Sequence, residues 1–444
     1  MSSYDVVVVG AGTAGCVLAA RLSEGLARRV CLVEAGPDYG AFDDGRWPAD
    51  LLDARALAFS HSWETDREDR SQLRARVVGG CSAHNACVVI AGAPADYDEL
   101  GTGWTYAELQ PYLERARVAL DTRVFALEEL SPWHRAFAAS VADPIVHEVN
   151  AKGTVRWHAG FAYLDPARPR PNLTILADTL ADRVLVEGSR AVGIATSHGD
   201  VHGTVIVLAC GAYGSPGVLL RSGIGPDSGL PVGEGLLDHV GVGLGFEPTD
   251  LLFEEWQRFV AEHPLFMGQV TLPLRSGSCP EGLWDLFAFP AAEIGADGGL
   301  EASAAIFAMK PVSRGRVTLT SSDPHAPLAV EHGFLADDRD ATVLADGVEQ
   351  LRELAAREPI ARYTSRETRP GADAPALEHV RSTARGFFHP TGTCAIGSVV
   401  DREGRILGFD GLVVADASIM PTIPRANTNL STAAIAERIA ETLD

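Results

Sequence analysis

A short apolar run opens the chain and is followed at once by small residues. Residues 5–9 are rich in valine, which is typical of a buried parallel strand. Residues 10–15, Gly-Ala-Gly-Thr-Ala-Gly, come next, and apolar positions with helical spacing follow over 17–22. A second apolar run at 30–33 ends in Glu34, 24 residues after the first glycine. This order predicts a strand, a glycine turn, a helix and a second strand, the unit that binds dinucleotides.

The residues of the predicted turn each have a physical role. Gly10 permits a tight turn, Gly12 lets the backbone approach a pyrophosphate, and Gly15 allows the helix to pack on the strand. The positive N-terminus of the helix would then face the phosphates, and Glu34 has the spacing of a ribose-binding carboxylate. The candidate cofactor-binding residues here are Gly10, Gly12, Thr13, Ala14, Gly15, Glu34 and Ala35. This motif alone does not distinguish NAD from FAD.

The far end of the chain carries a matching pattern. Residues 411–416, Gly-Leu-Val-Val-Ala-Asp, predict another buried strand that ends in Asp416. Apolar residues at every fourth position from Ile435 to Leu443 predict a final helix that starts at about Asn429. Because one nucleotide unit then uses both ends of the chain, the material between them must be inserted into it.

Composition sets limits on the class of protein. The 444 residues suggest two to three domain-sized units, and a net charge of −22 argues against nucleic-acid binding, since the surface would repel phosphates. Seven cysteines without CxxC spacing predict reduced thiols and no metal site. The N-terminus enters a strand without a basic, signal-like stretch, and we find no apolar run near the roughly 20 residues of a membrane span. We therefore expect a cytoplasmic protein.

A segment of very small residues precedes the first candidate histidine. Residues 79–83, Gly-Gly-Cys-Ser-Ala, have so little bulk that the backbone can lie against a large flat ligand. His84 and Asn85 follow directly. Residues 74–90 resemble the flavin-facing signature of the glucose-methanol-choline (GMC) oxidoreductases, in the choline-oxidase-like His-Asn form. In that form the histidine is bonded to FAD, so the resemblance implies FAD and a covalent link at His84. The alternative is noncovalent FAD with this ring packed beside it.

Two further segments extend the resemblance. Residues 205–225 are similar to the second signature of the family, and residues 172–193 are similar to a strand pair whose central valine, here Val184, contacts adenine through its backbone. The C-terminal helix of the family points its positive end at the flavin. The resemblance adds these residues to the cofactor site: Gly79, Gly80, His84, Asn85, Ala86, Val88, Val184, Asp416, Ala417, Asn427 and Thr428.

The candidate catalytic pair comes from two C-terminal segments. His389 lies in Phe-Phe-His-Pro-Thr-Gly-Thr-Cys, on a predicted loop, and this segment resembles the HPxGTC element whose histidine faces substrate and flavin. Asn427, 38 residues later, matches the place of the second active-site His or Asn. A neutral imidazole can accept the hydroxyl proton of an alcohol, and an amide can hydrogen-bond the same oxygen. The resemblance thus implies FAD-dependent oxidation of an alcohol to a carbonyl, with oxygen or another acceptor reoxidising the flavin.

The resemblance also implies a fold. We expect an α/β protein with a Rossmann-like FAD-binding domain and an inserted α+β substrate domain built on an antiparallel sheet. The predicted boundaries are 1–105, 170–240 and 385–444 for the FAD-binding domain, and 106–169 and 241–384 for the substrate domain. Only 69 residues separate Trp104 from Leu173, so the substrate domain is shortened, and residues 144–171 are expected to form a connecting loop. A smaller substrate domain predicts a more open active site, or an active site that a second subunit completes.

Several residues depart from a choline site. Ala86 replaces a hydroxyl residue, and a rough alignment puts Gln269 where the acid that binds trimethylammonium belongs. An aromatic wall without that acid suits an uncharged sugar-like, aromatic or aliphatic alcohol. Candidate aromatic residues are Trp47, Trp256, Trp284 and Phe388, with Phe387 at a place that could control oxygen access. The alternatives are a choline or amino-alcohol oxidase, a redox-neutral lyase on the same fold, and a flavin-binding protein without turnover.

Overall fold

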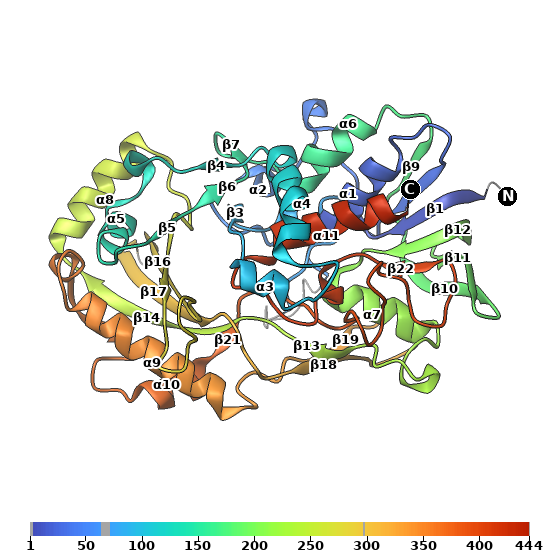
Figure 1. Cartoon of the computed structure of the whole chain (residues 1–444). Helices are drawn as coiled ribbons and strands as arrows, with labels where there is room; N and C mark the ends of the chain where they lie inside the picture. The colour runs from blue at the N-terminus through green and yellow to red at the C-terminus, as the bar shows by residue number, and fades with distance from the viewer. Residues whose placement is uncertain (1–2, 64–71, 296–297, 444) are drawn as a thin grey trace.

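The computed structural model describes residues 3–63, 72–295 and 298–443 (Figure 1). Two large sheets lie at opposite ends of the molecule, and each has its own hydrophobic core. Both chain termini lie at the end that holds the first sheet, and the helix labelled α11 returns the chain to it. The polypeptide therefore leaves the first sheet, builds the second, and comes back.

The first sheet contains the predicted nucleotide unit. Its strand order is β10-β11-β12-β1-β2-β9, with β22 paired to β12. The bounds are β1 (Tyr4–Val9), β2 (Val30–Val33), β9 (Leu173–Leu176), β10 (Ala181–Glu187), β11 (Arg190–Thr196), β12 (Val201–Leu208) and β22 (Leu412–Val414). The strands β22, β12, β1, β2 and β9 run parallel, whereas β10 and β11 form an antiparallel extension. The predicted strands near both ends of the chain thus lie in one parallel sheet.

Helices cover the first sheet. They are α1 (Thr13–Leu22), α4 (Tyr106–Ala119), α7 (Gly211–Arg221) and α11 (Thr428–Thr442). The two ends of the chain are joined where Arg21 of α1 donates to both carboxylate oxygens of Glu437 on α11, at 2.8 and 2.9 Å. Leu109 and Leu113 of α4 belong to the same core, although residues 106–169 are predicted to lie in the substrate domain. The division into domains stays a prediction.

The second sheet is antiparallel, as the resemblance implies. Its order is β20-β14-β17-β16-β15-β5, with β21 beside β14. The bounds are β5 (Ile145–Val146), β14 (Val240–Pro248), β15 (Val270–Leu274), β16 (Leu286–Ile294), β17 (Leu300–Ala308), β20 (Thr364–Arg369) and β21 (Arg385–Gly386). Around it lie α5 (Pro132–Ala138), α8 (Asp250–Glu262), α9 (Asp338–Ala355) and α10 (Ala376–Thr383). The predicted α/β fold with an inserted α+β part is confirmed.

The prediction of a connecting loop over 144–171 is wrong. This segment contains β5, β6 (Glu148–Val149), β7 (Ala151–Lys152), β8 (Val155–Arg156), a π-helix at Gly160–Leu164 and α6 (Asp165–Ala167). Its strands are two residues long, too short to show an alternation of apolar and polar residues. β5 pairs with β15, and β6 with β3 and β4, whereas β7 and β8 pair with each other. The remaining elements are α2 (Ala49–Leu52), α3 (Pro94–Asp98), β3 (Val88–Val89), β4 (Arg123–Val124), β13 (Glu234–Leu236), β18 (Gly315–Leu319) and β19 (Leu328–Glu331).

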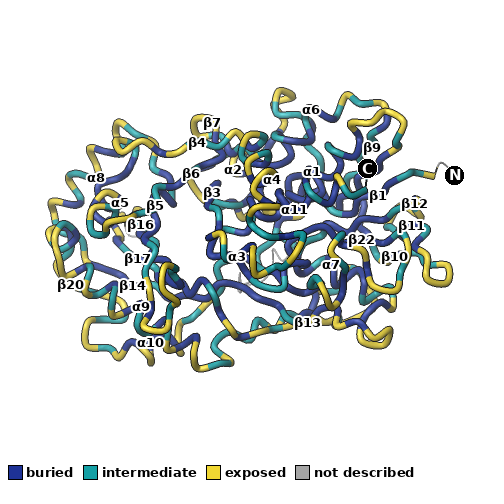
Figure 2. Tube along the Cα trace, in the orientation of Figure 1, coloured by how far each residue is buried: buried dark blue, intermediate teal, exposed yellow. Residues whose placement is uncertain are grey.

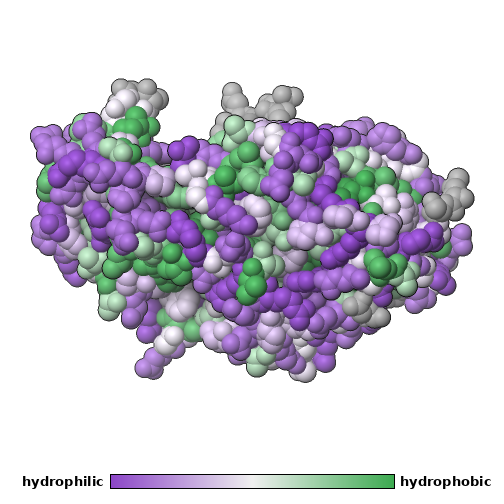
Figure 3. Space-filling view, turned by 90° about the horizontal axis from the view of Figure 1, so that it is seen from above, coloured by the Kyte–Doolittle hydropathy of each residue, from purple (hydrophilic) through white to green (hydrophobic). Residues whose placement is uncertain are grey.

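Burial follows the two sheets. The buried stretches in Figure 2 run along the strands of both sheets and along α1 and α11, while exposed residues lie at loops and outer helices. The face seen in Figure 3 is mostly hydrophilic, with apolar residues in separate patches. In the described part of the chain, no helix combines the length and the apolar character that crossing a membrane requires.

Candidate active site

Two glycine segments meet at the start of α1. Gly10 has a φ of +95°, and a side chain on Gly15 would lie 1.7 Å from the Gly10 carbonyl oxygen, so this helix packs on the turn as predicted. Gly80 has a φ of +54°, and a Cβ there would lie 2.5 Å from the Gly12 Cα. The Gly79 amide donates to the Ala11 carbonyl at 2.8 Å. The two segments therefore form one bed of bare backbone.

Two buried acids hold the loops at the strand ends. The Glu34 carboxylate accepts from the Ala11 amide at 2.8 Å and from the Gly36 amide at 2.9 Å. Burial, opposed by these two hydrogen bonds, raises the pKa of Glu34 to about 7. Asp416 accepts from the Gly211 amide at 2.8 Å and the Ser215 hydroxyl at 2.6 Å. Each acid fixes a glycine-containing turn at the carboxyl edge of the parallel sheet.

The N-termini of α1 and α11 lie together. The Thr13 hydroxyl donates to the Asn429 side-chain oxygen at 2.6 Å, which joins residues 416 positions apart. The N-caps Gly12 and Asn427 make no side-chain capping hydrogen bond, and neither helix has an acid in its first turn. The positive ends of both helix dipoles are thus left for a ligand, as predicted for the phosphates and the flavin.

His84 is buried next to the bed. It follows the short 3₁₀ helix Gly80–Ala83, and neither of its ring nitrogens has a hydrogen-bond partner in the described residues. Burial, only weakly opposed by the Ser60 backbone, lowers the pKa of His84 to about 4. The imidazole is therefore neutral, and a nitrogen lone pair is available for a ligand.

His389 and Asn427 come together as predicted. The Asn427 amide nitrogen lies 3.1 Å from His389 Nε2. The other ring nitrogen, Nδ1, lies 2.9 Å from Nδ1 of His239. Burial lowers the pKa of His389 to about 3, so its ring is neutral at neutral pH. A neutral imidazole nitrogen and an amide donor thus contact each other directly.

The turn that presents His389 is held from β14. The Asp238 carboxylate, directly before this strand, accepts from the His389 amide at 2.8 Å. Phe388 has a φ of +62°, a conformation that is strained for a bulky residue and that persists only where the surroundings enforce it. The Asp238 hydrogen bond and Pro390, which follows His389 through a trans peptide bond, keep the chain in this sharp turn.

Phe387 lies between His389 and an apolar cluster. The Phe387 ring lies 4.6 Å from the His389 ring and stacks on Phe307 at 3.8 Å with an interplanar angle of 8°. We call the buried residues of this cluster the apolar wall. They are Val88, Ile90, Phe287, Phe307, Met309 and Ala426, with Trp284, Phe289 and Phe387 partly buried against them. Through the apolar wall, β3, which follows the His84 segment, packs against β16 and β17 of the antiparallel sheet.

The sequence comparisons decide the family. Models of the GMC oxidoreductase family match residues 143–241 and 311–436, and a lycopene cyclase model matches residues 5–69. An oxygen-dependent choline dehydrogenase from Paraburkholderia phytofirmans is 32% identical over 533 residues, which cover 99% of this chain and 94% of the relative. The chain is a GMC oxidoreductase. A second choline dehydrogenase, from Burkholderia ambifaria, is 31% identical over 526 residues, with 99% and 93% covered.

Solved structures show the same fold. Pyridoxine 4-oxidase from Mesorbium loti matches with a TM-score of 0.86 and 26% identity, over 99% of both chains. A formate oxidase matches with a TM-score of 0.81 and 20% identity, over 100% of this chain and 98% of that one. The alignment to the Paraburkholderia relative spans 533 residues against 444 in this GMC oxidoreductase, so the relative carries segments that this chain lacks.

The residues present fit FAD, the cofactor of the family. Gly12, half-buried and without a side chain, lies at the N-terminus of α1, and the two uncapped helix ends supply donors for a pyrophosphate. Among the described residues, the ring nitrogens of His84 and the side-chain nitrogen of Asn429 are buried without hydrogen-bond partners. In the described chain no group of three or more His, Cys, Asp or Glu side chains could hold a metal ion.

Other predicted cofactor residues have partners within the protein. The Asn85 side-chain oxygen accepts from the Cys87 amide at 3.0 Å, and the Val184 amide donates to the Ser222 hydroxyl at 2.8 Å. Their contacts with FAD stay predictions. Buried residues at the predicted places are Ala14, Ala35, Val88, Ala417 and Thr428, with Ala86 half-buried.

Some aromatic and polar residues lie elsewhere than expected. Trp47 packs on His158 and Phe161 in the first core and donates to the Gly40 carbonyl at 3.0 Å, so it is not part of the substrate wall. Trp256 belongs to the second core, and Phe388 is exposed. The Gln269 amide is used by the backbone of residues 129 and 131. Of the predicted aromatic residues, Phe387 and Trp284 reach the apolar wall.

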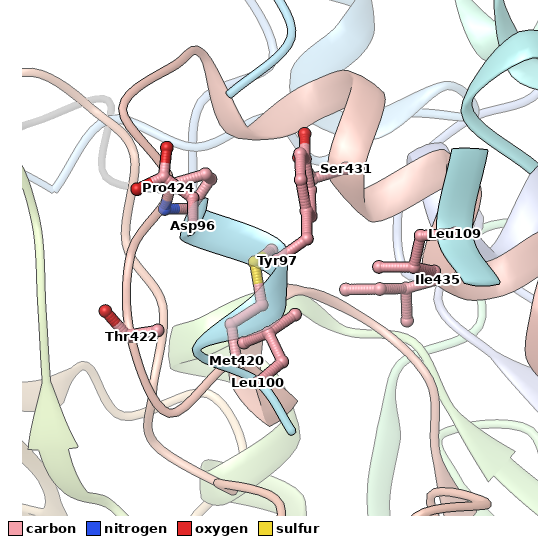
Figure 4. Close-up of a pocket in the computed structure, with 9 residues that line it drawn as sticks. All are labelled: Asp96, Tyr97, Leu100, Leu109, Met420, Thr422, Pro424, Ser431 and Ile435. Atoms are coloured by element: carbon pink, nitrogen blue, oxygen red, sulfur yellow. The ribbon is translucent and has the colours of Figure 1, made fainter. Parts of the chain in front are cut away.

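Sequence reasoning missed Asp238 and His239, which hold His389. The available signal was a pair of adjacent ionisable residues directly before an apolar strand, because such a pair must find partners when buried. A cavity of about 10 Å³ lies behind α11, where Tyr97 and Ser431 meet at 3.0 Å (Figure 4). It has room for about one water molecule and is lined mainly by apolar side chains, so it is not a substrate site.

Proposed function

We propose that this GMC oxidoreductase oxidises an uncharged alcohol to a carbonyl compound, with His389 as the base and Asn427 as its partner. The separation of 3.1 Å between His389 Nε2 and the Asn427 amide nitrogen carries the proposal. One hydroxyl oxygen in contact with both groups can donate its proton to Nε2 and accept a hydrogen bond from the amide. Neither group competes with the other for the proton.

The protein's part of the reaction follows from these contacts. Burial keeps His389 neutral, so Nε2 has a lone pair for the hydroxyl proton. The Asn427 N–H strengthens its hydrogen bond as the oxygen loses that proton and gains negative charge. Bound FAD supplies the acceptor for the hydride that leaves the alcohol carbon. The residues proposed to hold FAD are those of the glycine bed, the two helix ends, and Glu34 and Asp416 through the loops they fix.

The substrate class is inferred from the apolar wall. Phe387, whose ring lies 4.6 Å from the His389 ring, stacks on Phe307 and forms an aromatic surface with it. Such a surface suits an aromatic or aliphatic alcohol, but an aromatic face can also bind a trimethylammonium group, so choline is included in the test below. The pyridoxine 4-oxidase that matches at 26% identity, whose name gives an aromatic alcohol, supports this class. The names of the choline dehydrogenases favour the alternative.

Anaerobic reduction of the bound flavin tests the proposal. The FAD-loaded protein is mixed without oxygen with benzyl alcohol, a linear alcohol, a sugar and choline, and flavin absorbance is followed. We expect bleaching by an uncharged alcohol and about a 10²-fold or greater loss of its rate in His389→Ala, with FAD content unchanged. The exposed His198→Ala is the matched control and should keep the rate. A rate near wild type in His389→Ala refutes the base; no bleaching by any alcohol, with cleavage of a cyanohydrin, indicates a lyase.

We also propose that His84 carries the FAD covalently. Its buried, neutral and unpartnered ring nitrogens support this assignment. Acid precipitation should leave yellow colour on the polypeptide, and His84→Ala should release the colour to the supernatant. Colour released from the unmodified protein would show that the FAD is noncovalent.

The remaining properties of the proposed enzyme follow from composition and size. We propose the cytoplasm as its location, a small-molecule electron acceptor such as oxygen, and no nucleic-acid partner, given the net charge of −22. The shortened substrate region leaves a second subunit as a candidate to complete the site. Peroxide detection with oxygen present, and light scattering, measure the acceptor and the oligomeric state.

A further inference from the structure

A second histidine, His239, contacts the ring of His389 on the side away from Asn427. His239 is fully buried directly before β14, and its ring meets the His389 ring edge-on, with an interplanar angle of 84°. Its Nδ1 lies 2.9 Å from His389 Nδ1, and its Nε2 lies 3.0 Å from the Pro424 carbonyl oxygen. Both ring nitrogens of His239 are therefore used within the protein.

The Pro424 carbonyl fixes which nitrogen of each ring carries the proton. A carbonyl oxygen can only accept, so His239 Nε2 must be the donor. Burial holds the pKa of His239 well below its usual range, so this ring is neutral and its Nδ1 carries a lone pair. His389 Nδ1 must then donate to that lone pair, which leaves the lone pair of the neutral His389 ring on Nε2. This is the nitrogen that faces Asn427.

One loop, the segment before α11, contacts both histidines. Pro424 and Asn427 are three residues apart on the segment before α11, so the same loop binds His239 and faces the outer nitrogen of His389. The Arg425 amide between them donates to the Asp96 carboxylate at 2.8 Å, which anchors that loop to α3. On the other side, Asp238 holds the His389 backbone. The ring and the main chain of the base are thus fixed by adjacent residues, 238 and 239.

We propose that His239 is a positioning residue that sets the tautomer of His389, with the proton on Nδ1 and the basic lone pair on Nε2. This inference rests on the proposed function of His389 as the base. In this structure the Asn427 N–H also donates to Nε2, but the oxygen of a bound alcohol would take up that N–H. Without an acceptor behind Nδ1, the neutral ring can then place its proton on Nε2, and in that tautomer it cannot take a proton from a substrate. Loss of the correct tautomer costs about 10⁴-fold in the serine-protease triad, where an acid plays this part.

Two variants, both branched at Cγ, separate positioning from packing. His239→Leu fills the site without an acceptor, whereas His239→Asn keeps a side-chain oxygen that can accept from His389 Nδ1. In anaerobic stopped-flow mixing with the alcohol that bleaches the wild type, we expect His239→Leu to slow flavin reduction by about 10²-fold or more. Its substrate affinity should change less than about threefold, and His239→Asn should recover the rate to within about tenfold of wild type. In a His389→Ala background, His239→Leu should cause no further loss, since both changes remove one function.

A second readout needs no turnover. In FAD-loaded protein labelled with ¹⁵N-histidine, the His389 resonances, assigned by their absence in His389→Ala, should show a protonated Nδ1 and an unprotonated Nε2. In His239→Leu this pattern should be lost, and in His239→Asn it should be kept. Protonated Nε2 in the wild type, equal rates for the Leu and Asn variants, or a wild-type rate in His239→Leu would each overturn the inference. If no alcohol reduces the flavin, the proposed function fails while the NMR pattern still decides the tautomer.

Discussion

Gly80→Ala tests whether the two glycine segments build the FAD site by backbone contact. An alanine Cβ at this position would lie 2.5 Å from the Gly12 Cα, a distance that real Cβ atoms essentially never show, so the backbone must move. The residue also has a φ of +54°. The left-handed conformation costs an alanine about 1–2 kcal/mol, and a forced shift in a packed region costs about 1–3 kcal/mol more.

Gly153→Ala is the matched control. This glycine has a φ of +60° in the turn between β7 and β8, and a Cβ there meets nothing within 4 Å. We expect urea unfolding to show a loss of about 1–2 kcal/mol for Gly153→Ala and about 2–5 kcal/mol for Gly80→Ala. The ratio of flavin to protein absorbance after purification should fall in Gly80→Ala alone, because the change displaces Gly12, which is proposed to contact the pyrophosphate. Equal FAD content and equal stability in the two variants would refute the backbone-contact account.

Three further predictions concern ionisable groups. In a plot of the flavin-reduction rate against pH, the fall on the acid side should lie below about pH 5, since a base works above its pKa and burial lowers the pKa of His389 to about 3. A fall centred near pH 6.5 would contradict this. Stability should fall between about pH 6.5 and 5, because buried neutral histidines bind fewer protons folded than unfolded. These histidines are His84, His134, His147, His158, His239 and His389. Glu34 and Asp238, with pKa values raised to about 7, act in the opposite sense, as do Asp165 and Asp416, whose pKa values burial also raises. These four acids are fewer than the six histidines, so a thermal midpoint that does not fall with acidification would count against the account. Glu34→Gln should lose one of the two hydrogen bonds from Ala11 and Gly36 and weaken FAD retention by about tenfold or more, measured by flavin content after dialysis.

The features that the sequence predicted well are those written in contiguous residues. The strand, glycine turn and helix at 4–22 need no partner to be recognised, because each role falls on a fixed position. The pairing of His389 with Asn427 also followed from motifs, although 38 residues separate them. The final helix begins at Thr428, one residue before the expected Asn429, because Asn427 takes the N-cap position.

The features that it missed are decided by distant partners. Trp47 was assigned to the substrate wall as an aromatic residue, yet it finds Phe161 in the first core. The strands in 144–171 are two residues long, and the pairing of β5 with β15 and of β6 with β3 leaves no pattern in their own sequence. His239 is 150 positions from His389, and no spacing rule connects the two. A local sequence motif can predict the histidine, but it cannot predict which distant residue hydrogen-bonds the other nitrogen of its ring.

The partners of His389 explain why a low pKa is compatible with work as a base. Its ring contacts two neutral groups, His239 and Asn427, and among the described residues no carboxylate accepts from either ring nitrogen. A carboxylate in the place of His239 would raise the pKa of His389, so at a given pH a larger fraction of the rings would carry a proton on both nitrogens and lack the lone pair that an alcohol needs. A neutral imidazole in that place orients the ring and fixes its tautomer without this effect. The arrangement therefore secures the position of the lone pair at the expense of basicity, and proton transfer must be favoured by the loss of hydride from the alcohol carbon.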